Sequence, residues 1–193
     1  EDRIGDVDEA QRRPELRERI INELETTAEQ TDNRSALAQA LEARLSITSQ
    51  PVKRSALGRI KHEGATCGES RGRIVVYSGD DENGDYLYKF VGSKPWRKLI
   101  REGKSPLDHG TLYVARFHDD GNGEWLPLVH GQGTLTREYG FADQADVLIR
   151  TRAAADAVGA TKMDRPEWIA VHPATQEVYC TLTNNSQRGT KDK

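Results

Sequence analysis

The stretch MDRPEWIAVHPATQEVYCTLTNN, residues 163–185, decides how the second half of the chain is interpreted. Residues 168–171 carry a short apolar run, and residues 178–182 carry a second one. The six residues between them, His-Pro-Ala-Thr-Gln-Glu, have the composition of a turn. The stretch therefore predicts a β-hairpin with a loop of a few residues.

A short charged segment precedes the first of these strands. Pro166 fixes its own φ and favours an extended conformation for Arg165, so the segment is expected to be stiff. The guanidinium of Arg165 and the carboxylate of Glu167 would then be held at one strand end, where a metal ion and an anion could bind together. The alternative is an ordinary Arg–Glu surface pair of little energetic weight.

Composition excludes several classes of protein. Of the 193 residues, 35% are hydrophobic and 31% are charged, as in a polar, soluble protein. The length allows one core, or one domain with an appendage. The formal charge of −3 gives no strong field for nucleic acid, so no nucleic-acid partner is predicted. No run of about 18 apolar residues is present, which argues against a transmembrane segment. The chain begins Glu-Asp-Arg, without an apolar signal segment, which suggests a processed chain, a domain or a fragment.

The first fifty residues differ in kind from the rest. Apolar residues at helical spacing predict an amphipathic helix over about 14–30, and leucines at every fourth position predict a second helix after Ser35. We therefore divide the chain into a helical N-terminal segment, residues 1–50, and a β-rich portion, residues 51–193. The helical segment is expected either to cover an exposed strand edge or to associate with another chain.

The β-rich portion shows short strands separated by acidic, glycine-rich turns. Strands are predicted at 73–77, 86–91, 111–117 and 124–128, and turns at 79–85 and 119–123. This spacing favours an antiparallel all-β assembly, such as a propeller or a sandwich, over a βαβ fold. A surface helix is predicted over 143–157, ended by Gly159. Cys67 and Cys180 are expected to be free thiols.

Several residues could carry chemistry, each with a simpler explanation beside it. The acidic turn at 79–85 has the oxygen donors that calcium prefers, although its spacing is not that of an EF-hand and such turns are often only solvated. His62 and Glu63 are adjacent, so on a strand they would face opposite sides and only one would enter a site. The usual signatures of zinc proteases, serine hydrolases and nucleotide-phosphate loops are missing.

A family resemblance adds to this interpretation. Four segments, at 51–65, 73–91, 110–128 and 154–185, resemble the PhoX-type alkaline phosphatases in sequence and order, over about residues 51–189. Proteins of that family fold as a β-propeller whose central pocket holds ferric iron and calcium. They hydrolyse phosphate monoesters outside the cytoplasm. The resemblance implies a mainly β fold with partial β-propeller-like antiparallel sheets, preceded here by the N-terminal helical segment. It also implies a periplasmic or extracellular location.

The same resemblance suggests roles for four residues. Glu63, Asp81 and Glu167 are similar to metal-binding carboxylates of the family, and Arg165 to its phosphate-binding arginine. Arg165 and Glu167 are thus the candidate catalytic residues, Arg165 the candidate substrate-binding residue, and Ca²⁺ and Fe³⁺ the candidate cofactors. A phosphate monoester is the predicted substrate.

Two departures from the family qualify this prediction. The family contributes a cysteine ligand to iron from an upstream Cys-Glu motif, and no Cys precedes Pro51 here, so the predicted iron site is incomplete. Residues 51–193 also supply only about half of a complete propeller. The predicted function is a metal-dependent phosphomonoesterase, or a part of one. The alternatives are a non-catalytic calcium-binding β-module and a truncated product without independent activity.

Overall fold

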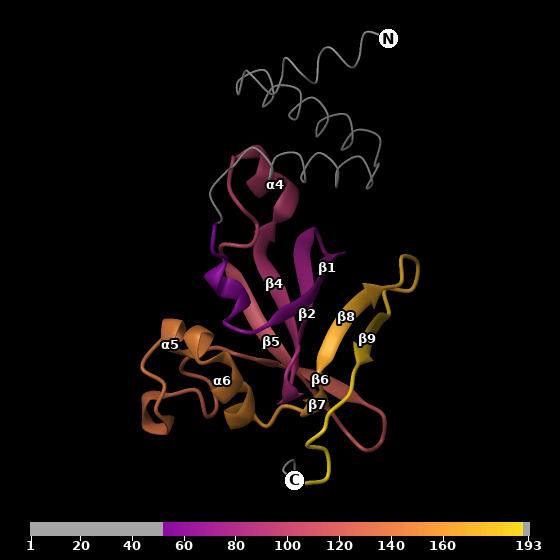
Figure 1. Ribbon diagram of the computed structural model, residues 1–193. Helices are drawn as coiled ribbons and strands as arrows, with labels where there is room; N and C mark the ends of the chain where they lie inside the picture. The colour runs from indigo at the N-terminus through magenta and orange to yellow at the C-terminus, as the bar shows by residue number, and fades with distance from the viewer. Residues whose placement is uncertain (1–51, 191–193) are drawn as a thin grey trace, which may run out of the picture. The chain divides into compact units, whose positions relative to one another are not determined.

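The computed structural model describes residues 52–190, and this part of the chain is mainly β (Figure 1). Its strands form one five-stranded sheet and two two-stranded sheets, and every pairing is antiparallel. The predicted mainly β class with antiparallel sheets is confirmed. The helices predicted between residues 14 and 45 lie outside the described residues. Within residues 52–190, no helix has the length and apolar character that crossing a bilayer requires.

The five-stranded sheet is the frame of the described region. In spatial order its strands are β1 (His62–Ser70), β2 (Arg73–Asp80), β4 (Leu87–Pro95), β5 (Gly110–Phe117) and β6 (Gly123–Pro127). The sequence predicts the last four because their apolar residues alternate or are β-branched. It gives no such signal for β1, whose sequence HEGATCGES contains two glycines and one β-branched residue.

One face of this sheet packs against helices and forms the larger core. Its buried residues come from alternate positions of the central strands, as the period of a strand requires: Val76, Tyr88, Phe90, Leu112 and Val114. Helices α5 (Gln144–Ile149) and α6 (Thr151–Val158) cover this face through the fully buried Val147, Ala154 and Ala155.

The helix predicted over 143–157 is present, but in two pieces. The chain leaves helical geometry at Arg150, where φ is −102° and ψ is 41°, and this residue separates α5 from α6. Gly159 ends α6 in the left-handed region with φ 75°, as predicted. Because Ala154 and Ala155 are fully buried, the helix is exposed on one side only.

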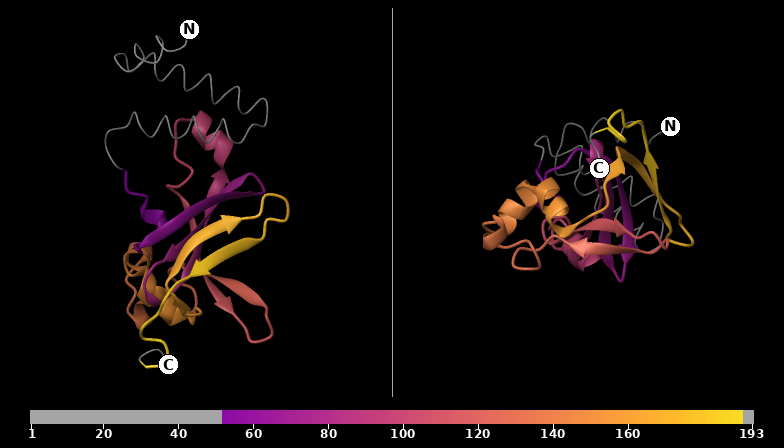
Figure 2. Two further views of the ribbon diagram at one scale, coloured as in Figure 1. Left: turned by 45° about the vertical axis from the view of Figure 1, so that its right-hand side comes forward. Right: turned by 90° about the horizontal axis from the view of Figure 1, so that it is seen from below.

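The opposite face of the sheet is partly covered by the hairpin predicted within residues 163–185. Strands β8 (Pro166–Val171) and β9 (Val178–Leu182) pair as predicted, and Ile169 packs with Leu87 and Ala115 in a second, smaller core. Figure 2 shows the hairpin on one side of the sheet and the two helices on the other. The five-stranded sheet is therefore covered by helices α5 and α6 on one face and by the β8–β9 hairpin on the other.

The acidic stretch at 79–85 is more ordered than the predicted turn. Strand β2 continues to Asp80, and β3 (Asn83–Asp85) pairs with β7 (Met163–Asp164). Asp80 is fully buried and Asp85 is buried, so neither is a solvated turn residue. By contrast, the predicted turn at 119–123 is exposed, and the Asp120 carboxylate accepts hydrogen bonds from its neighbour Asn122, as in an ordinary Asx turn.

Three short helical segments complete the described region. They are the 3₁₀ turns η1 (Ser55–Leu57) and η2 (Arg137–Tyr139) and the helix α4 (Trp96–Arg101). The sequence analysis did not predict α4, which follows Pro95 directly and is only six residues long. Cys67 and Cys180 are both free thiols, as predicted.

Candidate functional site

The candidate site begins where strand β2 ends. Asp80 and Asp81 are neighbours, and neighbouring strand residues point to opposite faces of a sheet. Asp80 faces the helices, whereas Asp81 faces the hairpin and accepts two hydrogen bonds from one guanidinium. Arg165 Nε lies 2.8 Å from Asp81 Oδ1, and Arg165 Nη2 lies 3.1 Å from Oδ2. This two-pronged contact fixes the plane of the guanidinium as well as its position.

Glu167 completes this arrangement from the first strand of the hairpin. Its Oε1 accepts a hydrogen bond from Arg165 Nη2 at 3.3 Å and another from Thr183 Oγ1 at 2.8 Å. Arg165 therefore lies between two carboxylates that are far apart in the chain. The side chains of Arg165, Asp81 and Glu167 are 35%, 23% and 21% exposed, so a small solute can still reach the group.

Arg165 has an unusual backbone conformation, and here the sequence prediction was wrong. Instead of the extended conformation expected before Pro166, its φ is 46°, in the left-handed region. The cause is the pairing on either side. Asp164 belongs to β7, which pairs with β3, while Pro166 begins β8, which pairs with β9, so the chain must turn sharply between them. Tertiary pairing overrides the local preference, and such outliers are often found at functional sites.

Two glycines allow the hairpin to approach the sheet so closely. A Cβ atom at Gly79 would lie 2.2 Å from the carbonyl oxygen of Pro166, and one at Gly64 would lie 2.9 Å from that of Glu167. Gly64 also has φ 62° and lies in the irregular part of β1, where the register with β2 shifts. The start of β8 thus packs against the backbone of Gly64 and Gly79, where no side chain intervenes. This close packing brings Arg165 and Glu167 to the end of β2.

Glu63 lies beside this group through its backbone. Its amide donates to the carbonyl oxygen of Lys61 at 2.8 Å, and the amide of Asp81 donates to the same oxygen at 3.4 Å. In the described part of the chain, the Glu63 side chain has no hydrogen bond or ion pair. The adjacent His62 makes separate contacts, with Ser78 Oγ and the carbonyl oxygen of Gly58, both at 3.1 Å.

Comparison with known proteins assigns the chain to a family. The model of the family described as alkaline phosphatase PhoX matches residues 42–193. The chain belongs to the PhoX family. Among solved structures it is similar to Pseudomonas fluorescens PhoX in complex with vanadate, a transition state analogue, with 53% sequence identity and a TM-score of 0.69. That match covers 75% of this chain and 27% of the other, so this chain spans about a quarter of its relative. A search of curated proteins found no match.

The residues that the PhoX resemblance predicts as metal ligands have suitable chemistry for a hard cation. Glu63, Asp81 and Glu167 offer carboxylate oxygens, and the buried Asn83 Oδ1 has no hydrogen-bond partner among the described residues. In the arrangement described for residues 52–190, however, no three His, Cys, Asp or Glu side chains are grouped as metal ligands. Arg165 engages both oxygens of Asp81 and one of Glu167. The carboxylate oxygens have the chemistry that a hard cation requires, and the guanidinium competes for the same oxygens.

A second group of charged residues of this PhoX chain was missed by the sequence analysis. Asp80 receives two hydrogen bonds from Arg152, which lies 72 residues further along the chain on α6. Thr183, the donor to Glu167, belongs to the Thr-Leu-Thr-Asn-Asn segment that carried part of the resemblance, but its role was not foreseen. Alternation along β2 could have placed Asp80 on the helix side, whereas nothing in the sequence indicates Arg152 as its partner.

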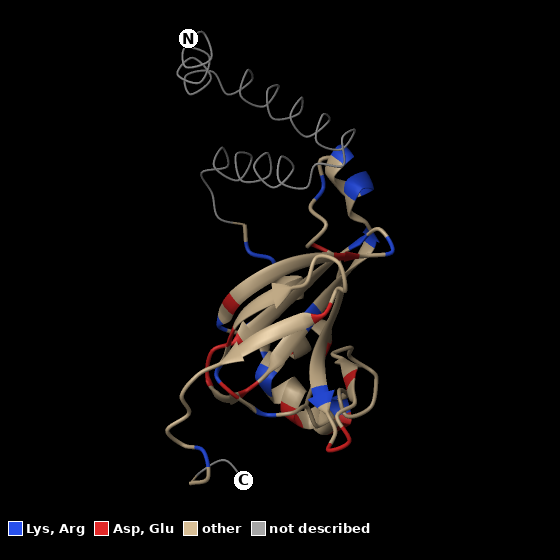
Figure 3. Ribbon diagram, turned by 90° about the vertical axis from the view of Figure 1, so that its right-hand side faces the viewer, with Lys and Arg blue, Asp and Glu red and all other residues tan. Residues whose placement is uncertain are grey.

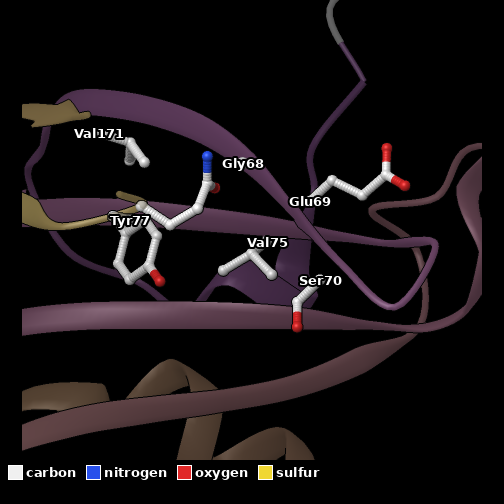
Figure 4. A pocket seen from close by; sticks show the side chains of 7 residues that line it. Gly68, Glu69, Ser70, Val75, Tyr77 and Val171 are labelled. Atoms are coloured by element: carbon white, nitrogen blue, oxygen red, sulfur yellow. The ribbon is translucent and has the colours of Figure 1, made fainter. Parts of the chain in front are cut away.

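A shallow pocket lies elsewhere and is not part of this group (Figure 4). Its lining residues are Gly68, Glu69, Ser70, Val75, Tyr77, Val171 and Gln176. They lie at the end of β1, on β2 and around the tip of the hairpin, whereas Glu63 and Glu167 lie near the starts of β1 and β8. No Lys or Arg lines the pocket. The ribbon in Figure 3 carries both acidic and basic positions. Arg165 is distinguished by its contacts with Asp81 and Glu167.

Proposed function

We propose that this chain forms the phosphate-binding part of a metal-dependent phosphomonoesterase of the PhoX type. The observation that carries the proposal is the accessible guanidinium of Arg165, which Asp81 and Glu167 hold in place. The backbone of Arg165 is in the strained left-handed region. The family match supports the same function, as does the similarity to a PhoX that binds vanadate, a transition state analogue. Both favour a phosphatase over a non-catalytic calcium-binding module.

The geometry leaves Arg165 able to bind an anion without losing its supports. Its Nε and Nη2 donate to Asp81 and Glu167, while Nη1 makes no hydrogen bond within residues 52–190. The N–H groups of Nη1 therefore remain for the oxygens of a phosphoryl group, which Arg binds well because its donors are planar and always charged. The hydrogen bond to Asp81 raises the pKa of Arg165 further, so the cation persists at any working pH.

The proposal assigns the carboxylates to two tasks. Glu63, Asp81 and Glu167 would hold the metal ions, which we take from the resemblance to be Ca²⁺ and Fe³⁺. When bound, such ions polarise a phosphoryl oxygen and lower the pKa of a coordinated water. Asp81 and Glu167 also orient the guanidinium, and Thr183 orients Glu167 by donating to its Oε1. Preorganised charges of this kind favour the transition state over the substrate.

The resemblance extends the proposal to the context of the enzyme. We place it outside the cytoplasm, in the periplasm or beyond, and we take the described sheets as a portion of a β-propeller. Association through residues 1–50 or through an open strand edge stays a prediction. Edge strands β1 and β6 of the five-stranded sheet are where such pairing would occur.

Substitution of Arg165 in the full-length protein tests the proposal. Arg165→Lys keeps the charge but loses the planar fork, so the KM for p-nitrophenyl phosphate should rise about tenfold and inhibition by phosphate should weaken. The matched control is Arg97→Lys, because Arg97 also donates to a carboxylate, Glu69, at 2.8 Å. Arg97 lies on α4 and Glu69 lies at the far end of β1, away from Glu63. Elemental analysis of the same preparations would show which metals are bound. Unchanged kinetics in Arg165→Lys would remove Arg165 from the site.

A further inference from the structure

We propose that Arg152 is a positioning residue for the candidate site, which it never touches. It would act by fixing the backbone that carries Glu63 and Asp81 on the other face of the sheet. The inference rests on the proposed function, since it concerns the same group of carboxylates. It adds a residue from helix α6 that neither its place in the sequence nor the family resemblance indicates.

Arg152 ties together the two ends of the acidic stretch. Its Nε lies 2.7 Å from Asp80 Oδ2, and its Nη2 lies 2.6 Å from Asp80 Oδ1. The same Nε lies 3.2 Å from Asp85 Oδ2. The Asp80 carboxylate is fully buried while the Arg152 side chain is 39% exposed, so the two-pronged contact fixes a carboxylate that is itself shielded from water. Asp81 directly follows the anchored Asp80 in the chain.

The anchored carboxylate is connected to the site through Lys61. Asp80 Oδ1 accepts a hydrogen bond from the amide of Lys61 at 3.0 Å. The carbonyl oxygen of Lys61 in turn accepts the amides of Glu63, at 2.8 Å, and Asp81, at 3.4 Å. Lys61 is thus hydrogen-bonded to Asp80 on the helix side of the sheet and to the amides of Glu63 and Asp81, the predicted metal ligands on the hairpin side.

Helix α6 has enough other contacts to stay in place without Arg152. Ala154 and Ala155 are fully buried in the core, and Tyr86 donates a hydrogen bond to Asp156 at 2.5 Å. Thr151 is also fully buried, and its hydroxyl accepts from the amide of Arg59 at 3.0 Å. Attachment of helix α6 to the sheet therefore does not require Arg152. Within residues 52–190, however, no other side chain makes the two-pronged contact with Asp80.

A conservative substitution separates positioning from folding. Arg152→Lys retains a cation near the buried Asp80, but an ammonium cannot reproduce the two parallel contacts. We expect the variant of the full-length protein to fold, with the amides of Lys61, Glu63 and Asp81 exchanging hydrogen faster than in the wild type. Orthovanadate should bind about tenfold more weakly, at the low end of what losing an outer-shell partner costs a site. Most of the kinetic loss with p-nitrophenyl phosphate should appear in kcat.

Two controls give each outcome a meaning. Arg97→Lys should change neither the exchange of those three amides nor vanadate affinity. Asp85→Asn leaves the Asp80 fork intact, so vanadate affinity should stay within about twofold of the wild type. Uniform acceleration of all amides in Arg152→Lys, vanadate binding equal to the wild type, or failure to fold would each overturn the inference. A wild-type protein that binds no vanadate would instead refute the proposed function, while the exchange data would still decide whether Arg152 fixes this backbone.

Discussion

Two neighbouring aspartates, Asp80 and Asp81, form the same kind of ion pair on opposite faces of one sheet. Each accepts a two-pronged contact from an arginine far away in the sequence, Arg152 for Asp80 and Arg165 for Asp81. Their surroundings differ. Asp80 is fully buried beneath helix α6, whereas the Asp81 side chain is 23% exposed beside the hairpin. Arg152 lies in a regular helix, while Arg165 is held at φ 46°.

The difference separates a structural contact from a candidate binding group. A buried ion pair is costly to break, because the remaining charge is left in a poor solvent. An exposed pair contributes little to stability. The side chains of Arg152 and Arg165 are similarly exposed, at 39% and 35%, so the contrast lies in the burial of the two carboxylates. The strained backbone of Arg165 points the same way, because such outliers cluster at functional sites.

The largest expected contrast comes from neutralising each aspartate in turn. Asp80→Asn should lower the free energy of unfolding by about 3 kcal/mol, the low end for a broken buried pair, since Arg152 keeps Asp85 and some solvent. Asp81→Asn should lower it by at most about 1 kcal/mol. Urea unfolding of both variants measures the two losses. Equal losses would show that the two pairs are not distinct in kind.

A second variant removes the candidate site without touching its side chains. Gly79→Ala places a methyl group against the carbonyl oxygen of Pro166, so the hairpin must move away from β2. We expect a loss of about 2 kcal/mol, as for other overpacked positions, together with loss of vanadate binding. Gly68→Ala is the control, because a Cβ atom there meets nothing within 4 Å. Retained vanadate binding in Gly79→Ala would contradict the close seating of the hairpin.

The strain at Arg165 can be measured by comparing two truncations. Arg165→Gly and Arg165→Ala both remove the guanidinium, but only glycine adopts a positive φ without steric cost. The glycine variant should therefore unfold at a higher temperature than the alanine variant, by roughly 2–4 °C. Neither variant should bind vanadate. A glycine variant no more stable than the alanine one would mean that the left-handed conformation carries no strain.

The last prediction concerns pH and belongs to the buried side. Burial, and then the charge of Asp80, raises the pKa of Asp85 from 3.8 to about 6. Below pH 3.8 both folded and unfolded chains hold this proton. As the pH rises towards 6, only the unfolded chain loses it, so the folded state loses stability, and above 6 the loss is complete. The stability of Asp85→Asn relative to wild type should therefore increase between pH 4 and pH 6. Urea titrations at pH 4, 5, 6 and 7 would reveal a flat difference if the pKa were ordinary.

Much of the frame could be predicted from local patterns, and the contacts of the site could not. The strands β2, β4, β5 and β6 and the hairpin follow from alternation and turn composition, which depend on near neighbours. The family resemblance singled out Glu63, Asp81, Arg165 and Glu167. In the structure Arg165 contacts both Asp81 and Glu167. Their roles in binding metal and phosphate stay predictions until measured.

The failures have a common physical cause. Strand β1 lacks a strong pattern of its own and is held by pairing with β2. The conformation of Arg165 is imposed by pairings of β7 and β8 with different partners, against the local preference before proline. Arg152 finds Asp80 across 72 residues. In each case the deciding interaction is tertiary, and a single sequence does not reveal which distant segments meet.

The bare backbone at Gly64 and Gly79 has a practical consequence for protein engineering. The backbone of the hairpin packs directly against the backbone of β1 and β2 at these glycines. The distance between the hairpin and the sheet therefore does not depend on the side chains of the outer surface of the hairpin. Trp168 and Tyr179 on that surface are 68% and 59% exposed. We expect that both can be substituted by polar residues, for solubility or for surface immobilisation, without changing the distance between Arg165 and Asp81.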